Sequence, residues 1–135
     1  MKLDNFRRKF LRIHGTMLFL VGITAAITSL IGKIYGTGPF GFLKANQMVA
    51  IGLFEAYLLA AVCGVFLLVG SFQEKVYKWN RMGAIIHVPL FTTNIIFWNF
   101  YSEVGMEMGG IISTIAHGIL ICVESFLGFS KIETK

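Results

Sequence analysis

The residues best suited to acid–base chemistry in this sequence are two glutamates and two histidines that lie in apolar segments. Glu55 and Glu124 interrupt long apolar runs, while His87 and His117 lie in the third and fourth of these runs with Asn94 nearby. A charged side chain at the centre of a bilayer costs at least about 2.5–3.5 kcal/mol on insertion scales, and histidine titrates near neutral pH. These five residues predict a buried polar relay that handles protons or a quinone headgroup.

The depth of each polar residue can be counted inward from the polar end of its apolar segment. At about 1.5 Å per residue, Glu55, Asn94 and His117 all fall roughly 12–13 Å deep. His87 and Glu124 fall about 10 Å deeper by the same count. We therefore expect one group made of Glu55, His117 and Asn94, and a second made of His87 and Glu124. The alternative is that hydrogen bonds between helices, at about 0.6 kcal/mol each, simply hold the helices together.

The two histidines also raise the question of a bound haem, because neutral imidazole is a common axial ligand. The counted depths of His87 and His117 differ by roughly 9 Å, which is poor geometry for one macrocycle. No Glu-x-x-His pair predicts a metal site, and no GxSxG motif supplies a nucleophile. Cys63 and Cys122 are single thiols in different segments. Quinone and haem thus stay as cofactors to test, and no metal is expected.

Four apolar segments must position these residues. They cover about residues 13–32, 47–71, 81–102 and 108–129, and each is long enough to cross about 30 Å of hydrocarbon. The 135 residues are 56% hydrophobic and 14% charged, against about 25% charged residues in soluble domains. The sequence predicts an all-α integral membrane protein, a four-transmembrane-helix bundle that forms a single domain over residues 1–135.

The net charge of +5 is concentrated at the ends of these segments. Basic residues precede the first segment, follow the fourth and lie between the second and third, so the positive-inside rule predicts that both termini are cytoplasmic. We expect the chain to lie in the inner (plasma) membrane. Basic and aromatic residues do not interleave on a soluble face, which excludes nucleic acid as a partner.

The amino-terminal segment MKLDNFRRKFLRI places apolar residues at helical spacing opposite a basic face. This pattern predicts an amphipathic helix that lies in the membrane interface on anionic lipid, although the same charges also serve as an orientation signal. The residues expected at the lipid interface are four basic residues and two tryptophans: Arg7, Arg8, Lys9, Arg12, Trp79 and Trp98.

Small residues recur at helical spacing and predict faces where helix backbones approach closely. Such faces can pack against the chain itself, a second copy or other membrane subunits. The residues expected to pack in this way are Gly15, Gly22, Gly52, Ala56, Ala60, Gly64, Gly105 and Gly109.

Three short motifs resemble DoxX-like membrane proteins. They are Arg12-x-x-Gly15-x-x-x-Phe19-x-x-Gly22, Gly52-Leu53-Phe54-Glu55 and Leu67-Leu68-Val69-Gly70. The resemblance covers the first two apolar segments and implies a small four-helix protein, with Glu55 as the carboxylate that recurs early in the second helix. It also implies a subunit that depends on partners, since some members are subunits of quinone-reducing or oxidase assemblies. The chain departs from the pattern after Glu55, where the family tends to have glycines.

Almost no mass lies outside the apolar segments, so the chain is not expected to be an enzyme on its own. We expect a structural or accessory subunit of a larger membrane assembly or oligomer. The alternative is a redox subunit that handles quinone or protons at the buried Glu, His and Asn residues. A small transporter and a haem b subunit are further alternatives.

Overall fold

The computed structural model describes residues 2–130, and this part of the chain is helical without any strand. The elements are α1 (Lys2–Tyr35), the 3-10 helix η1 (Gly41–Lys44), α2 (Gln47–Gly70), α3 (Val76–Ile96), α4 (Trp98–Glu103) and α5 (Glu107–Phe129). The expected all-α fold class is confirmed. The chain divides into two compact units. The first is Ile13–Leu68, and the described parts of the second are residues 2–12 and 69–130.

Three helices, α1, α2 and α5, are long and apolar enough to cross a membrane, judged by length and composition. This agrees with three of the four expected spans and with a membrane protein. The remaining long helix, α3, falls outside this group. Within its 21 residues it carries Asn80, Arg81, His87 and Asn94, which lower its hydropathy.

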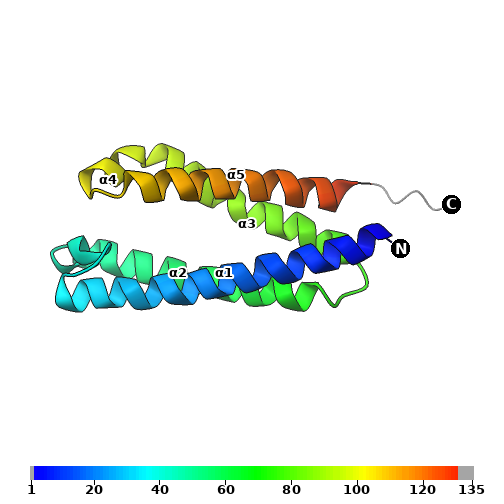
Figure 1. Ribbon diagram of the computed structural model, residues 1–135, viewed down its shortest axis with the longest axis horizontal. Helices are drawn as coiled ribbons and strands as arrows, with labels where there is room; N and C mark the ends of the chain where they lie inside the picture. Colours follow the sequence, from blue (N-terminus) through cyan, green and yellow to red (C-terminus); the bar gives the residue numbers. More distant parts are fainter. Residues whose placement is uncertain (1, 131–135) are drawn as a thin grey trace. The chain divides into compact units, whose positions relative to one another are not determined.

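In the first unit, α1 and α2 run antiparallel, side by side (Figure 1). Glycines let their backbones touch. A Cβ atom placed on Gly64 would lie 2.5 Å from the Phe19 nitrogen, and one on Gly22 would lie 2.7 Å from the Ala61 nitrogen. Distances of this kind leave no room for any side chain. Gly22 and Gly64 therefore pack against a helix of this chain.

Two glycines shape the connection between α1 and α2. Gly36 and Gly38 both have φ of +71°, a left-handed conformation that favours glycine. The chain then turns through η1, which buries Leu43 completely and ends at Lys44. Gly36, Gly38, Pro39 and Gly41 lie close together in this connection, and glycine and proline at such density end a helix and form turns.

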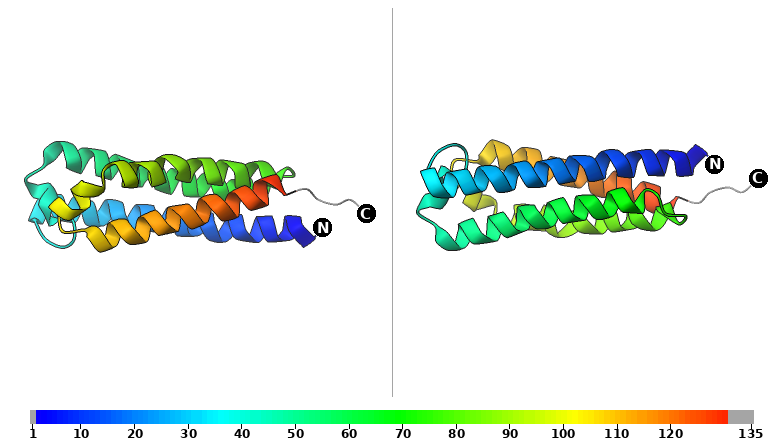
Figure 2. Two further views of the ribbon diagram at one scale, coloured as in Figure 1. Left: turned by 90° about the horizontal axis from the view of Figure 1, so that it is seen from above. Right: turned by 90° about the horizontal axis from the view of Figure 1, so that it is seen from below.

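In the second unit, α3 and α5 pack along each other (Figure 2). The structure differs here from the expectation of one helix over residues 81–102. The helix begins at Val76, continues through Pro89 and ends at Ile96. Phe97 interrupts it with φ −100° and ψ 29°, and the short helix α4 follows. The break is accompanied by a bond from the Tyr101 hydroxyl back to Asn94 Oδ1 at 2.6 Å.

Arginines bind the carbonyl groups at the end of α5. Arg7 donates from Nε to the Leu127 oxygen and from Nη2 to the Ser130 oxygen, both at 2.7 Å. Arg81 donates from Nε to the Gly128 oxygen at 2.9 Å. The last carbonyls of a helix have no partners within it and carry partial negative charge, so cations stabilise this end.

The amino-terminal segment is helical, as expected, but it is the beginning of α1 and not a separate interfacial helix. Arg7 was expected at the lipid interface, yet it is only 1% exposed and forms an ion pair with Asp4 at 2.8 Å. The difference arises because the Arg7 guanidinium donates hydrogen bonds to carbonyl oxygens at the end of α5. Sequence periodicity shows the face on which a residue lies, but it does not show which helix covers that face.

Candidate functional site

Polar side chains line the contact between α3 and α5 at a spacing of seven residues. Asn80, His87 and Asn94 recur at this interval on α3, and Tyr101 continues it on α4. Two helical turns separate such residues, so they share one face. On α5, His117 and Glu124 show the same interval. We call this set the polar seam; it consists of Asn80, His87, Asn94, Tyr101, Ser113, His117 and Glu124.

The first pair of the polar seam joins Asn80 and Glu124. Asn80 Nδ2 donates to Glu124 Oε2 at 2.7 Å, and both residues are 0% exposed. Gly83 provides the space, because a Cβ atom there would lie 2.7 Å from Glu124 Oε1. The Asn80 Oδ1 atom is buried and has no hydrogen-bond partner among the described residues. A neutral amide thus binds the carboxyl group in the interior.

The second pair joins the two histidines. The Nδ1 atoms of His87 and His117 lie 2.9 Å apart, and the ring centroids lie 5.0 Å apart. A hydrogen bond between two ring nitrogens needs a proton on one and a lone pair on the other. At least one of the two rings must therefore be neutral for the bond to exist. Protonation of both rings would break it.

The third group is centred on Asn94. Its Nδ2 atom donates to Ser113 Oγ at 2.9 Å, and its Oδ1 atom accepts from the Tyr101 hydroxyl at 2.6 Å. The Ser113 hydroxyl donates in turn to the Gly110 oxygen at 3.1 Å. Gly110 lies against the Tyr101 ring, with 2.8 Å between its position for a Cβ and the ring atom Cγ. The side chains of Asn94, Tyr101 and Ser113 thus connect α3, α4 and the start of α5.

These pairings differ from the expected grouping of His87 with Glu124 and of His117 with Asn94. The depth count placed His87 and His117 roughly 9 Å apart because it started from Ser102. The helix that carries His87 ends at Ile96. Counted from Ile96 and from Glu107, the two histidines lie about 13.5 and 15 Å along their helices, which matches the observed contact.

Glu55 has a different environment from the acid in the polar seam. It lies on α2 in the first unit, where its side chain is exposed. No hydrogen bond or ion pair within residues 2–130 involves it. The structure thus brings four of the five predicted relay residues into the polar seam, while Glu55 belongs to the other unit, where it is exposed.

The predicted packing residues fall into three environments. Gly15, Gly22 and Gly64 lie against the backbone of the neighbouring helix. Gly52 has nothing within 4 Å of its Cβ position, and the neighbouring small residues Ala56 and Ala60 are exposed and half-buried. Near α5, Gly105 occupies a turn with φ +69°, and Gly109 meets only the end of Met106 at 3.8 Å.

The two tryptophans predicted at the lipid interface both contact the protein. Trp79 lies against Gly70, and the Trp98 ring lies beside Tyr101, with 5.9 Å between the ring centroids and 57° between the ring planes. Sequence reasoning did not single out Asn80, Gly83 or Gly128. Asn80 binds Glu124, Gly83 leaves space for the Glu124 side chain, and Gly128 leaves space for Arg81. The seven-residue spacing from Asn80 to Tyr101 is the signal that could have found the first of these.

The geometry limits what the polar seam can do chemically. Its three groups are separated by seven residues, or about 10 Å of helix rise. Within each group, donors and acceptors meet directly. These contacts join α3 and α4 to α5 at three levels along the helices.

The same geometry bears on haem and metal ligation. The contact between the histidines occupies Nδ1 of each ring, so a haem ligated by both would have to use the Nε2 atoms. In the described part of the chain, no cluster of three or more His, Cys, Asp and Glu side chains could hold a metal ion.

Comparisons with known proteins gave no relative. No family model, no curated protein and no solved structure matches this chain. The resemblance to DoxX-like proteins therefore stays a prediction.

Proposed function

We propose that this chain is an accessory subunit of a larger membrane assembly and that α2 carries its docking face. In this proposal α3 crosses the inner membrane as a fourth span beside α1, α2 and α5, with both termini cytoplasmic. The apolarity of the three other helices supports the membrane location. The basic residues at the segment ends support the orientation.

The observation that carries the proposal is the exposed carboxylate of Glu55 on an apolar helix face. Around it, Met48 is 81% exposed, Leu59 is 64% exposed and Phe66 is 57% exposed. We call these four residues the α2 face. A carboxylate that faces hydrocarbon costs at least about 2.5–3.5 kcal/mol, so a group that binds it is expected.

The exposed face of α5 provides a comparison within the same molecule. Ile112, Ile115 and Ile119 are 62%, 57% and 57% exposed, and all of them are apolar. Lipid chains alone can cover such a face, because it has no polar group that needs a partner. The α2 face differs from it by the one acid, so the two faces are predicted to have different neighbours.

The chemistry of the α2 face specifies the partner. We infer a transmembrane helix of another protein that places a cation or a hydrogen-bond donor at the depth of Glu55. Gly52 and Ala56 would let that helix approach closely, because nothing lies within 4 Å of the Gly52 Cβ position and Ala56 is exposed.

The proposal is tested by the size of the native complex after mild solubilisation. The wild-type chain should migrate with a second membrane protein on a native gel, and Glu55→Leu should release it. Glu107→Leu is the matched control, because it removes an exposed carboxylate from the first turn of α5. A wild-type chain that runs alone, or only as copies of itself, would contradict the proposal.

A second function, proton handling, is favoured by one observation, the bond between His87 and His117. Because the bond cannot survive protonation of both rings, the pair can respond to pH. Proteoliposomes that contain the chain and a pH-sensitive dye would then lose a proton gradient faster than liposomes that contain His117→Phe. Equal rates for the two would reject this function.

A further inference from the structure

We propose that Arg8, Lys9 and Arg12 form a binding site for a phosphate-bearing anion, the chemistry of an anionic phospholipid headgroup. A shallow depression of about 480 Å³ lies at the amino-terminal part of α1 and is lined by Asn5, Phe6 and these three cations. None of the described residues that line it is a carboxylate. The inference is independent of the α2 face, since every residue it uses lies in the second unit.

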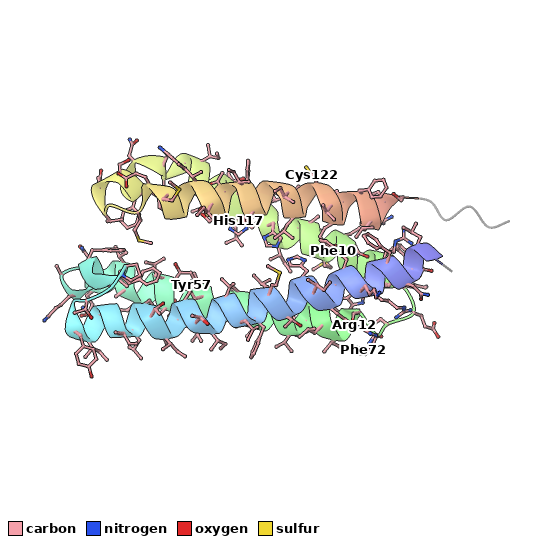
Figure 3. The ribbon with its side chains drawn as sticks, in the orientation of Figure 1. Phe10, Arg12, Tyr57, Phe72, His117 and Cys122 are labelled. Carbon is pink, nitrogen blue, oxygen red and sulfur yellow. The ribbon has the colours of Figure 1, made fainter. Side chains whose placement is uncertain are left out.

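The turn that follows α2 holds both arginines in place. Arg8 Nη1 donates to the Ser71 oxygen at 2.8 Å, and Arg12 Nε lies 3.4 Å from Ser71 Oγ. The Arg12 guanidinium also stacks over the Phe72 ring at 4.6 Å from its centroid, as Figure 3 shows for the two labelled side chains. Fixed cations lose less conformational entropy when an anion binds than free ones do.

These contacts leave most of the donors available. Each guanidinium carries five N–H groups, and the contacts with Ser71 use one of them in each arginine. Lys9 adds three more N–H donors from an exposed position on the same helix face. Two guanidinium forks and an ammonium suit the tetrahedral arrangement of phosphate oxygens.

Among the described residues, no acid forms an ion pair with Arg8, Lys9 or Arg12. The nearest acid on α1, Asp4, is bound to Arg7, which in turn caps α5. Phe6, at 54% exposed, supplies an apolar edge beside the cations. The depression thus offers charge to a headgroup and apolar surface to the chains attached to it.

The test compares two lipids bound to the full chain in phosphatidylcholine vesicles. Spin-labelled phosphatidylglycerol should associate more tightly than spin-labelled phosphatidylcholine. Lys9→Gln should lower this preference roughly fivefold, the effect of about one basic residue at a membrane surface. Because Lys9 makes no described contact within the protein, this variant should fold normally. Arg8→Gln combined with Arg12→Gln should abolish the preference.

Lys78→Gln is the matched control, since it removes an exposed lysine of the second unit outside the depression. It should leave the lipid preference unchanged. Inorganic phosphate, added at constant ionic strength, then separates two sources of the anion. Displacement of phosphatidylglycerol means that free phosphate binds as well, and no displacement assigns the site to the lipid headgroup. No preference in the wild type, or an equal loss in Lys9→Gln and Lys78→Gln, would overturn the proposal.

Discussion

Replacement of Gly64 by alanine tests whether close backbone contact holds α1 and α2 together. The added Cβ would lie 2.5 Å from the Phe19 nitrogen and 2.7 Å from the Gly15 oxygen. These are backbone atoms, which cannot rotate away as the end of a side chain can. Overpacking of this kind costs about 1–3 kcal/mol. We therefore expect Gly64→Ala to lower the free energy of unfolding by about that amount relative to a matched alanine variant.

The matched variant is Gly52→Ala, which lies on the same helix and belongs to the same stripe of small residues as Gly64. Nothing lies within 4 Å of its Cβ position. Alanine gains about 0.8–1 kcal/mol of helix propensity over glycine at either site, so the difference between the two variants isolates the contact with α1.

The unfolding of both variants can be followed by far-ultraviolet circular dichroism as denaturing detergent is added to mixed micelles. Gly64→Ala should unfold at a lower detergent fraction than the wild type, and Gly52→Ala at the same or a higher fraction. Equal midpoints for the two variants would refute the packing of α1 against α2 through glycine.

Three further predictions concern the second unit. Tyr101→Phe should lower the free energy of unfolding by about 0.6 kcal/mol, because it removes the hydrogen bond to Asn94. Tyr35→Phe, at a residue that is 67% exposed, should leave the free energy of unfolding unchanged. Equal losses in the two variants would contradict this prediction. Arg7→Gln should raise hydrogen exchange of the amides in the last turn of α5, because it removes charged donors worth about 1.5–3 kcal/mol each; unchanged exchange would argue against this cap. Nitrogen-15 spectra of the histidine rings at neutral pH should show one ring of the His87 and His117 pair protonated on Nδ1 and the other unprotonated there; two rings with the same protonation would exclude the bond.

The sequence predicts the all-α fold and the helix-ending turn at Gly36–Gly41, because hydropathy, segment length and glycine density are local properties. It does not predict the contact between His87 and His117, because the depth count ran through Phe97, where the helix breaks without glycine or proline. The face on which a residue lies follows from its spacing. The partner across that face depends on where the neighbouring helix begins and ends.

The small-residue pattern shows a similar limit. Gly52 and Gly64 belong to one stripe in the sequence, yet only Gly64 lies against another backbone. The spacing of small residues cannot distinguish the two glycines, because it does not show how far along α2 the backbone of α1 stays in contact. Arg7 shows the same limit for charge, since its role at the end of α5 depends on a contact 120 residues away in the chain.

The most direct test of the proposed docking role is photocrosslinking from the α2 face in native membranes. A benzophenone side chain at Leu59, one turn from Glu55, should form an adduct with another membrane protein, and Glu55→Leu should abolish that adduct. The same side chain at Ile119, which has similar exposure on α5, should react with lipid alone. Adducts of equal yield from both positions, or an adduct from Leu59 that persists in Glu55→Leu, would contradict the account.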